Sequence, residues 1–512
     1  MLGSLAGAAL VLVVAAGGGP RAQEELPNLV LFVVDDLGWQ DTSVAFSGTA
    51  GPFQERFETP HLAALARHGL AFSDAHAQCV CTPSRLSMLT GLSSARHGCT
   101  NWVLDPARET SGETTALGPP PRWEARGWRE GTPTLPARLA ARGYRTIHAG
   151  KAHFGGLGTK GADPRAVGFD VNIAGHAAGA PGSYQARHGF DEPGRTTRGP
   201  WAVPGLERFH GTEAHLTDVT TELALAAVNA AVEEGRPFYL HLAPYAVHTP
   251  LEPHEPFAQH FRARGLDEGE ARYASMVAGV DASLGALRAR LAALGVAERT
   301  LIVFTSDNGG LSAHARGTSA TGGGADTHNL PLREGKGSAY EGGTRVPLLV
   351  AWADPAPESA LQRRFPVRAG ALEPTPTICE DLFPTLLAAA GVAAPAGIDG
   401  LDLAPLLAGR APLPERALVF HYPHVWGPQR GGYQPHSSIR RGPWKAIHFY
   451  ATGRWELYDL AQDLGERHDL AAERRDVLLP LARELCERLH ALAAPFPRDK
   501  ATGEERPIRL PG

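Results

Sequence analysis

Asn28-Leu29-Val30-Leu31-Phe32-Val33-Val34 is followed directly by Asp35-Asp36. A short, almost wholly apolar run of this kind is typical of a strand buried on both faces, as in the middle of a parallel sheet. In open sheets flanked by helices, ligands bind outside the carboxyl ends of the strands. The two aspartates therefore indicate both the fold class and the first place to look for a functional site.

Strands and helices alternate along the chain after this run. Thr59-Pro60 and Thr132-Pro133 predict helix starts, with Thr as N-cap and Pro as the first helical residue. Longer helices are expected near 213–234 and 267–294, and further strands at 144–149, 238–242, 300–304 and 346–352. This alternation predicts an α/β sandwich with a large, mostly parallel central sheet flanked by helices.

The pattern changes after about residue 405. Short segments at 417–420, 444–449 and 455–458 are separated by Gly, Pro and Arg, and a helical pattern covers 472–494. We therefore expect a catalytic α/β domain at 23–404 and a smaller C-terminal subdomain at 405–512, with a short antiparallel sheet and a terminal helix.

The composition is that of an ordinary globular protein, with 43% hydrophobic and 20% charged residues among 512. A net charge of -5 gives no basic footprint, so we expect no nucleic-acid partner. An apolar run at 5–16, followed by small residues, predicts a signal peptide at 1–22 and an exported protein, periplasmic or secreted. A buried N-terminal segment is the alternative. No later run is long enough for a membrane span.

Polar side chains end two of the expected strands. Asp35-Asp36 follows the first, and Asp307-Asn308-Gly309 follows the strand at 300–304. Carboxylate and amide oxygens are the ligands preferred by hard divalent cations such as Ca²⁺ or Mg²⁺. A single Asp in such a place usually caps a turn, but two clusters at matching positions favour a metal site.

Cys81 precedes a short helical pattern that Gly91 closes. Thr82 and Pro83 suggest the N-cap and first helical residue, which places Cys81 at a helix N-terminus, where anions and activated nucleophiles are stabilised. From these residues alone, a thiol nucleophile and a small buried core cysteine remain open. A metal site with Cys79 is disfavoured, because one residue separates the two and no second pair exists.

The run Cys81-Thr82-Pro83-Ser84-Arg85, followed by Leu89-Thr90-Gly91, resembles the signature of the formylglycine-dependent sulfatases, the arylsulfatase family of the alkaline phosphatase superfamily. The resemblance covers roughly residues 26–490, and several other motifs follow in the family's order. These are Gly150-Lys151-Ala152-His153, His248-Thr249-Pro250, Ser306-Asp307-Asn308-Gly309, Gly335-Lys336-Gly337 and residues 340–347. The resemblance implies an alkaline-phosphatase-like fold and hydrolysis of sulfate esters.

The resemblance also implies a cofactor and a metal. A formylglycine-generating enzyme would oxidise Cys81 during maturation, and the hydrate of the resulting aldehyde would attack the sulfate ester. Ca²⁺, with Mg²⁺ as the alternative, would be held by oxygen ligands and would also contact the modified Cys81. The implied metal ligands are Asp35, Asp36, Asp307 and Asn308.

The remaining implied roles concern charge and protons. Asp307 would accept the proton of the attacking hydroxyl, and His153 that of the second hydroxyl. Arg85 and Lys151 would stabilise the hydrate, and Lys151 also belongs to the expected substrate contacts. His248 and Lys336 would face the ester oxygens, and we favour His248 as the group that protonates the leaving group.

The substrate expected from this resemblance is a sulfated sugar or polysaccharide, with a simple aryl sulfate second. The loop near 172–190, with His421 and His424, is expected to shape the sugar pocket, since His and aromatic side chains bind sugars. We expect Arg345 to be structural, and Asp281 to serve packing or capping. A phosphoester hydrolase of the same superfamily and a non-catalytic glycan-binding protein are the competing functions.

Overall fold

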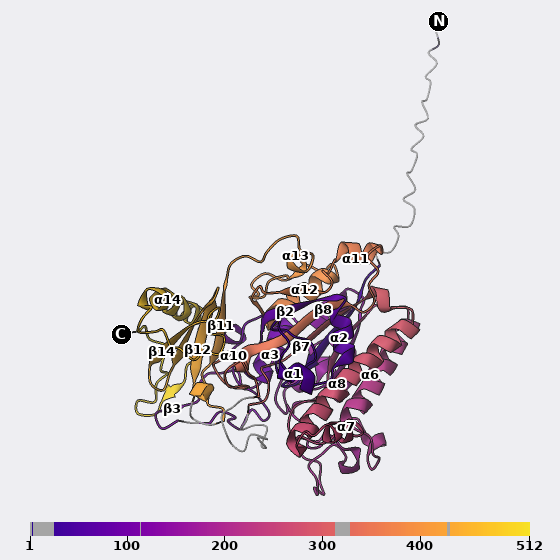
Figure 1. The fold of residues 1–512 in the computed structure, drawn as a ribbon, viewed down its shortest axis with the longest axis horizontal. Coiled ribbons are helices and arrows are strands. Elements are labelled where there is room, and N and C mark those ends of the chain that lie inside the picture. Colours follow the sequence, from indigo (N-terminus) through magenta and orange to yellow (C-terminus); the bar gives the residue numbers. More distant parts are fainter. Residues whose placement is uncertain (1–2, 4–24, 113, 313–327, 428–430, 512) are drawn as a thin grey trace.

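The computed structural model describes residues 3, 25–112, 114–312, 328–427 and 431–511 (Figure 1). The expected signal peptide at 1–22 therefore lies outside the described residues, apart from Gly3. Within the described part, no helix combines the length and the apolarity that a bilayer crossing requires.

A nine-stranded sheet forms the centre, in the order β10-β2-β8-β7-β1-β6-β4-β5, with β9 paired to β2. Its strands are β1 (Asn28–Val34), β2 (Gly69–His76), β4 (Arg145–Gly150), β5 (Val171–Ile173), β6 (Phe238–Ala243), β7 (Thr300–Ser306), β8 (Arg345–Trp352), β9 (Ala371–Glu373) and β10 (Thr377–Ile378). The pairs among β7, β1, β6, β4 and β5 are parallel, whereas β8 runs antiparallel to both β7 and β2. The expected mostly parallel central sheet is confirmed.

Helices cover both faces of this sheet. The main ones are α2 (Pro60–Ala66), α3 (Cys81–Thr90), α5 (Leu135–Ala141), α6 (Leu216–Glu233), α8 (Glu268–Ala293) and α12 (Leu382–Ala389). The other α-helices described before the C-terminal sheet are α1 (Pro52–Arg56), α4 (Ser94–His97), α7 (Phe257–Ala263), α10 (Glu341–Thr344), α11 (Ala360–Arg364) and α13 (Ala404–Leu407). In Figure 1, α6 and α8 run side by side along one flank of the molecule.

The central strand β1 shows why the sheet is buried on both faces. Leu29, Leu31 and Val33 belong to the core shared with α3, α5 and α12. The alternate residues, such as Val30 and Phe32, belong to the core shared with α2, α6 and α8. Successive strand side chains point to opposite faces. Full burial of each such side chain contributes about 1.5–3 kcal/mol to the stability of the fold. The apolar side chains of β1 therefore stabilise its position in the middle of the sheet.

A second, four-stranded antiparallel sheet lies near the C-terminus, with helix α14 (Arg475–Ala491) packed on it (Figure 1). Its strands are β11 (Ala417–Tyr422), β12 (His436–Arg441), β13 (Trp444–Phe449) and β14 (Arg454–Asp459). A two-stranded ribbon joins β3 (Leu117–Gly118) to β15 (Arg498–Asp499). The small antiparallel sheet and terminal helix are confirmed, while the domain boundary at 404/405 stays a prediction.

Two helix starts differ from the expectation. Helix α5 begins at Leu135, with Thr134 as the N-cap whose hydroxyl accepts the N–H of Ala137, so the expected start at Thr132 is wrong. Helix α3 begins at Cys81 itself, with extended Val80 in the cap position. Thr82 therefore lies inside the first turn, where its hydroxyl accepts the N–H of Val103 instead of capping the helix.

Asp281 and Arg345 have the structural roles expected of them. Asp281 in α8 accepts the N–H groups of His61 and Leu62 at 3.0 and 2.8 Å, and so caps α2 from a neighbouring helix. Arg345, at the start of β8, pairs with Glu341 at 2.8 Å and with Asp74 at 3.1 Å.

Candidate active site

The carboxyl ends of β1 and β7 bring the two acidic clusters together. These strands are parallel neighbours in which Val34 pairs with Ser306, so the residues that follow each strand lie side by side. The amide group of Asn308 donates to Asp36 Oδ1 at 2.8 Å, and the backbone N–H of Asp36 donates to Asp307 Oδ1 at 3.2 Å. Asp36 has a left-handed backbone, with φ of 61°, a conformation that is uncommon for residues other than glycine, although Asp adopts it more readily than most.

Three buried cations face the three buried carboxylates. Lys151 Nζ, just after β4, lies 2.7 Å from Asp35 Oδ1. Lys336 Nζ lies 2.8 Å from both oxygens of Asp36. The third cation, Arg85 on α3, likewise pairs with the carboxylate of Asp307. These close contacts between opposite charges lower the cost of burying the polar cluster, because an unpaired buried charge is strongly destabilising.

The cations decide the ionisation of two of these carboxyls. Burial opposes ionisation of Asp36, but Lys336 and His248 hold the pKa of Asp36 below its ordinary value. Burial likewise opposes ionisation of Asp307, and Arg85 outweighs it, so the pKa of Asp307 is also lowered. Both groups are therefore carboxylates at neutral pH, as metal ligation or proton acceptance requires.

Cys81 lies at the first position of α3, is buried, and lines a cavity of about 140 Å³. Burial raises the pKa of the Cys81 thiol, although Lys151 and Lys336 act in the opposite direction. The thiol is thus protonated at neutral pH, which does not suit an unmodified thiolate nucleophile.

Two histidines line the same cavity. His153 Nε2 lies 2.6 Å from the carbonyl oxygen of Val103, which can only accept, so Nδ1 carries the free lone pair. Burial and the charge of Lys151 lower the pKa of His153 well below its ordinary value. His248 Nδ1 lies 2.8 Å from the carbonyl oxygen of Thr249, and its Nε2 lies 3.6 Å from Asp36 Oδ2.

The structure does not bring His421 and His424 to the cavity, which corrects the expected sugar contacts. Both ring nitrogens of His421 are occupied at 2.7 Å, by the Ser437 hydroxyl and the Pro495 carbonyl. His424 is fully buried, with Nε2 2.8 Å from the Thr100 hydroxyl. Neighbouring segments cover β11, and both imidazole rings are therefore buried in the core around this strand.

Sequence reasoning missed three tryptophans that line the cavity, Trp102, Trp201 and Trp426. They come from widely separated segments, and a lone Trp in a loop carries no local signal of a binding site. Of the loop near 172–190, Gly179 and Ala180 line the cavity, and Gly179 packs directly against the ring of His153.

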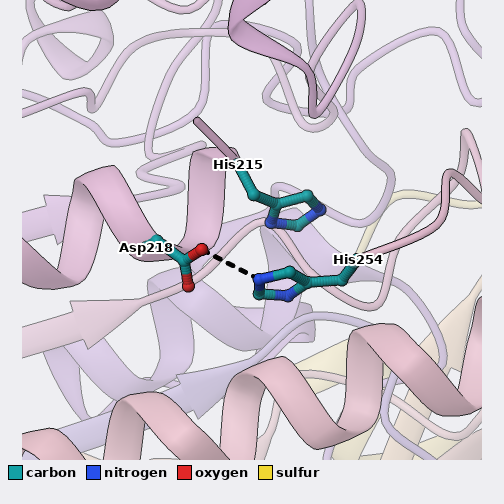
Figure 2. A group of neighbouring side chains, drawn as sticks. All are labelled: His215, Asp218 and His254. Atoms are coloured by element: carbon teal, nitrogen blue, oxygen red, sulfur yellow. Dashed lines mark hydrogen bonds and ion pairs between the residues drawn. The ribbon is translucent and has the colours of Figure 1, made fainter. Parts of the chain in front are cut away.

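His215, Asp218 and His254 gather at the N-terminus of α6, outside this cavity (Figure 2). His254 Nε2 lies 2.9 Å from Asp218 Oδ2, and the two imidazoles stack with centroids 3.8 Å apart and planes 10° apart. A cation shared by rings stacked in this way would lie out of both ring planes, whereas imidazole binds metals in its plane. Tyr184 also stacks on His215, and its hydroxyl donates to the carbonyl of His248 at 2.9 Å, so the group supports that segment.

Comparisons with known proteins agree with this site. A family model described as Sulfatase matches residues 27–392, and one described as N-sulphoglucosamine sulphohydrolase, C-terminal, matches residues 335–494. Arylsulfatase A from Homo sapiens is 30% identical, covering 98% of this chain and 95% of that protein. A protein named Sulfatase from Formosa agariphila is 26% identical, covering 91% of this chain and 88% of that protein.

Solved structures share the whole fold. The crystal structure of Ps i-CgsB superposes with a TM-score of 0.72 and 27% identity, covering 91% of this chain and 93% of that one. The full-length matches, the cysteine signature at the N-terminus of α3 and the carboxylates at the ends of β1 and β7 all agree. The chain belongs to the sulfatase family of the alkaline phosphatase superfamily and is a sulfuric ester hydrolase.

Proposed function

We propose that this chain is an exported sulfatase that hydrolyses the sulfate ester of a sulfated carbohydrate, using a formylglycine made from Cys81 and a divalent cation. The observation that carries the proposal is the convergence of Cys81, three carboxylates and three cations at one edge of the sheet. The carbohydrate is suggested by the related Ps i-CgsB, which was solved in complex with k-i-k-neocarrahexaose. The apolar run at 5–16 supports export.

The oxygen donors at the ends of β1 and β7 fit a hard cation such as Ca²⁺, with Mg²⁺ as the alternative. Asp35, Asp36, Asp307 and Asn308 would hold it. Asn308 Oδ1 is buried and has no hydrogen-bond partner among the described residues, as expected of an oxygen reserved for a ligand. The cation would polarise the sulfate group when bound.

The aldehyde derived from Cys81, once hydrated, would supply a hydroxyl that can attack sulfur. Position 81 lies one helical turn before Arg85, so the two side chains project from the same face of α3. Arg85 and Lys151 place positive charge beside this hydroxyl and beside the sulfate oxygens, where negative charge develops during transfer.

Two groups of the chain are placed to move protons at position 81. Asp307 is ionised and can accept the proton of the attacking hydroxyl. His153 presents an unprotonated, buried Nδ1 and can take the proton of the second hydroxyl as sulfate is expelled.

His248 and Lys336 line the cavity, where they would face the ester oxygens of a bound substrate. We propose His248 as the proton donor, with Lys336 neutralising the ester oxygen. Burial and Lys336 lower the pKa of His248 to about 3, so His248 must gain its proton once substrate charge enters the cavity. The assignment predicts that Ala at position 248 slows esters of alcohols with high pKa more than esters of acidic phenols, since only the former need protonation.

The test is mass spectrometry of the peptide carrying Cys81, from protein coexpressed with a formylglycine-generating enzyme. The same preparation is assayed on a phenyl sulfate, a phenyl phosphate and a sulfated monosaccharide. A mass shift from thiol to aldehyde, with turnover of the sulfates, supports the proposal. Unmodified Cys81 in fully active enzyme would overturn the nucleophile, and preferred turnover of the phosphate would overturn the reaction class.

A further inference from the structure

The lining of the active-site cavity divides into a reactive part and an aromatic part. The reactive part consists of Cys81, His153, His248 and Lys336, each of which has a proposed role in cleavage of the sulfate ester bond. The other side chains around the cavity are apolar, and three of them are the indoles of Trp102, Trp201 and Trp426. The mechanism proposed above uses none of the three.

Trp426 is held in place by the turn after Lys336. Gly337 has a left-handed backbone, with φ of +87°, and a Cβ there would lie 2.3 Å from the six-membered ring of Trp426. Only glycine therefore lets the indole lie so close to this turn. Lys336 Nζ lies 5.7 Å from the centroid of the same ring, within the range of a cation–π contact. The indole thus borders the sulfate-binding lysine directly.

Because of Trp426, segments next to both sheets contribute residues to the same cavity. Trp426 follows β11 of the antiparallel sheet, whereas Trp102 and Trp201 belong to long loops of the central domain. The C-terminal sheet therefore supplies part of the cavity wall, although the reactive groups all come from the central domain.

We propose that Trp102, Trp201 and Trp426, here called the tryptophan wall, bind the ring that carries the sulfate and so determine specificity. The inference rests on the proposed function, because sulfate bound at the reactive part leaves only the remaining lining for the leaving group. Indole faces attract the flat C–H face of a pyranose and the face of an aromatic ring through the same burial of apolar surface. The chemical class is a sulfate ester on a six-membered ring.

The experiment uses the matured full chain and the variants Trp426→Ala, Trp426→Phe and Trp201→Ala. Trp444→Ala is the matched control, because Trp444 begins β13 of the C-terminal sheet and packs against Arg474, the residue before α14. Substrates are a sulfated monosaccharide, 4-nitrophenyl sulfate and ethyl sulfate, which has no ring. Inorganic sulfate serves as an inhibitor without a leaving group.

Trp426→Ala is expected to lower kcat/KM on ring sulfates by about tenfold or more, which corresponds to about 1.4 kcal/mol. Trp201→Ala should act in the same direction, and Trp426→Phe should restore most of the loss. The inhibition constant of inorganic sulfate should change less than about twofold, since the sulfate contacts remain. A loss of kcat/KM confined to the monosaccharide sulfate would show that the tryptophan wall binds pyranoses. An equal loss of kcat/KM on 4-nitrophenyl sulfate would show that it binds six-membered rings in general.

Unchanged kcat/KM on both ring sulfates would overturn the inference. Equal weakening of inorganic sulfate would also overturn it, because Trp426 would then act only by positioning Lys336. A binding measurement tests the tryptophan wall even if the proposed reaction mechanism is wrong. Calorimetric titration of Cys81→Ala with the monosaccharide sulfate needs no turnover, and adding Trp426→Ala should weaken that binding about tenfold. Unchanged binding would refute the wall independently of the mechanism.

Discussion

Arg85 Nε lies 2.7 Å from Asp307 Oδ2, and both side chains are completely buried. This pair ties the first turns of α3, which carry Cys81, to the end of β7. Arg85 also donates to the carbonyl oxygen of Lys151 at 2.9 Å, so one guanidinium connects the helix to two strand ends. The position of Cys81 over the carboxylates therefore depends on Arg85.

Replacing Arg85 by Met is expected to lower the free energy of unfolding by about 3–5 kcal/mol, because Asp307 would be left buried without its closest cation. The double variant Arg85→Met/Asp307→Asn should lose less than the sum of the single losses. Denaturant titrations of the four proteins measure this coupling. Arg264→Ala, which breaks an exposed pair with Glu58 and a hydrogen bond to the Glu55 carbonyl, is the control and should cost less than about 1 kcal/mol. Additive losses would show that the pair is not coupled.

Cys81→Ser is expected to leave the fold intact and to abolish turnover, because serine has nearly the same volume but is not converted to the aldehyde. Circular dichroism and thermal melting should match the parent, while sulfatase activity falls below detection. The variant should be checked by mass spectrometry, since a host enzyme able to oxidise serine would restore the aldehyde. Near-normal activity from an unmodified serine would contradict the proposed nucleophile.

Calcium is expected to raise the melting temperature, because a ligand that binds only the folded state stabilises it by about 2.7 kcal/mol at 100 times its Kd. Asn308→Ala should weaken this gain, since it removes the unpartnered Oδ1. Asn229→Ala, on helix α6, is the control and should respond to calcium like the parent. Differential scanning calorimetry with Ca²⁺ and with a chelator measures the effect without relying on activity. Equal gains in both variants would place the ion elsewhere.

Glu380 is expected to contribute a loss of stability as pH rises from about 5 to about 8. Burial, and then the neighbouring Asp381, raise the pKa of Glu380 from 4.5 to about 8. Below pH 4.5 both the folded and the unfolded states hold this proton. At higher pH the unfolded state releases it first, which favours unfolding by about 1.4 kcal/mol per pH unit until the folded state also ionises.

Glu380→Gln should remove this part of the pH dependence. Urea titrations at a series of pH values should show that the stability of the variant relative to the parent rises with pH and is largest near pH 8. Exposed Glu487→Gln on α14 is the control and should follow the parent profile. A variant profile parallel to that of the parent would show that Glu380 ionises normally in the folded protein.

Tyr184→Phe is expected to lower kcat, because the Tyr184 hydroxyl donates to the carbonyls of Tyr245 and His248, at 2.6 and 2.9 Å. The Tyr245 carbonyl still accepts the backbone N–H of His248 at 3.1 Å, so the variant chiefly loses the hydrogen bond to the His248 carbonyl, at a cost of about 0.5–1.5 kcal/mol, and the segment that carries His248 is loosened. Tyr450→Phe removes a buried hydroxyl in the C-terminal sheet and is the control. It should reduce stability without changing kcat. Equal effects on kcat would exclude a positioning role for Tyr184.

The sequence by itself determined the elements whose signals are local. The apolar run at Asn28–Val34 ends at Asp35-Asp36, and the one at Thr300–Ser306 ends at Asp307-Asn308. Run length and the polar residues that follow were enough to predict buried strands that end in carboxylates. The cysteine signature before a helix likewise needs only a few consecutive residues.

Only the tertiary structure decided which distant segments meet. Strand β12 escaped prediction because its sequence, His-Ser-Ser-Ile-Arg-Arg, is polar, although it is largely buried and Arg440 pairs with Asp74 of the central domain. His421 and His424 were assigned to the cavity from residue type, yet packing around β11 encloses them. Trp426 gave no local signal and reaches the cavity only because the antiparallel sheet lies beside the turn at Gly337. Such contacts depend on the burial of the whole core, which no short segment encodes.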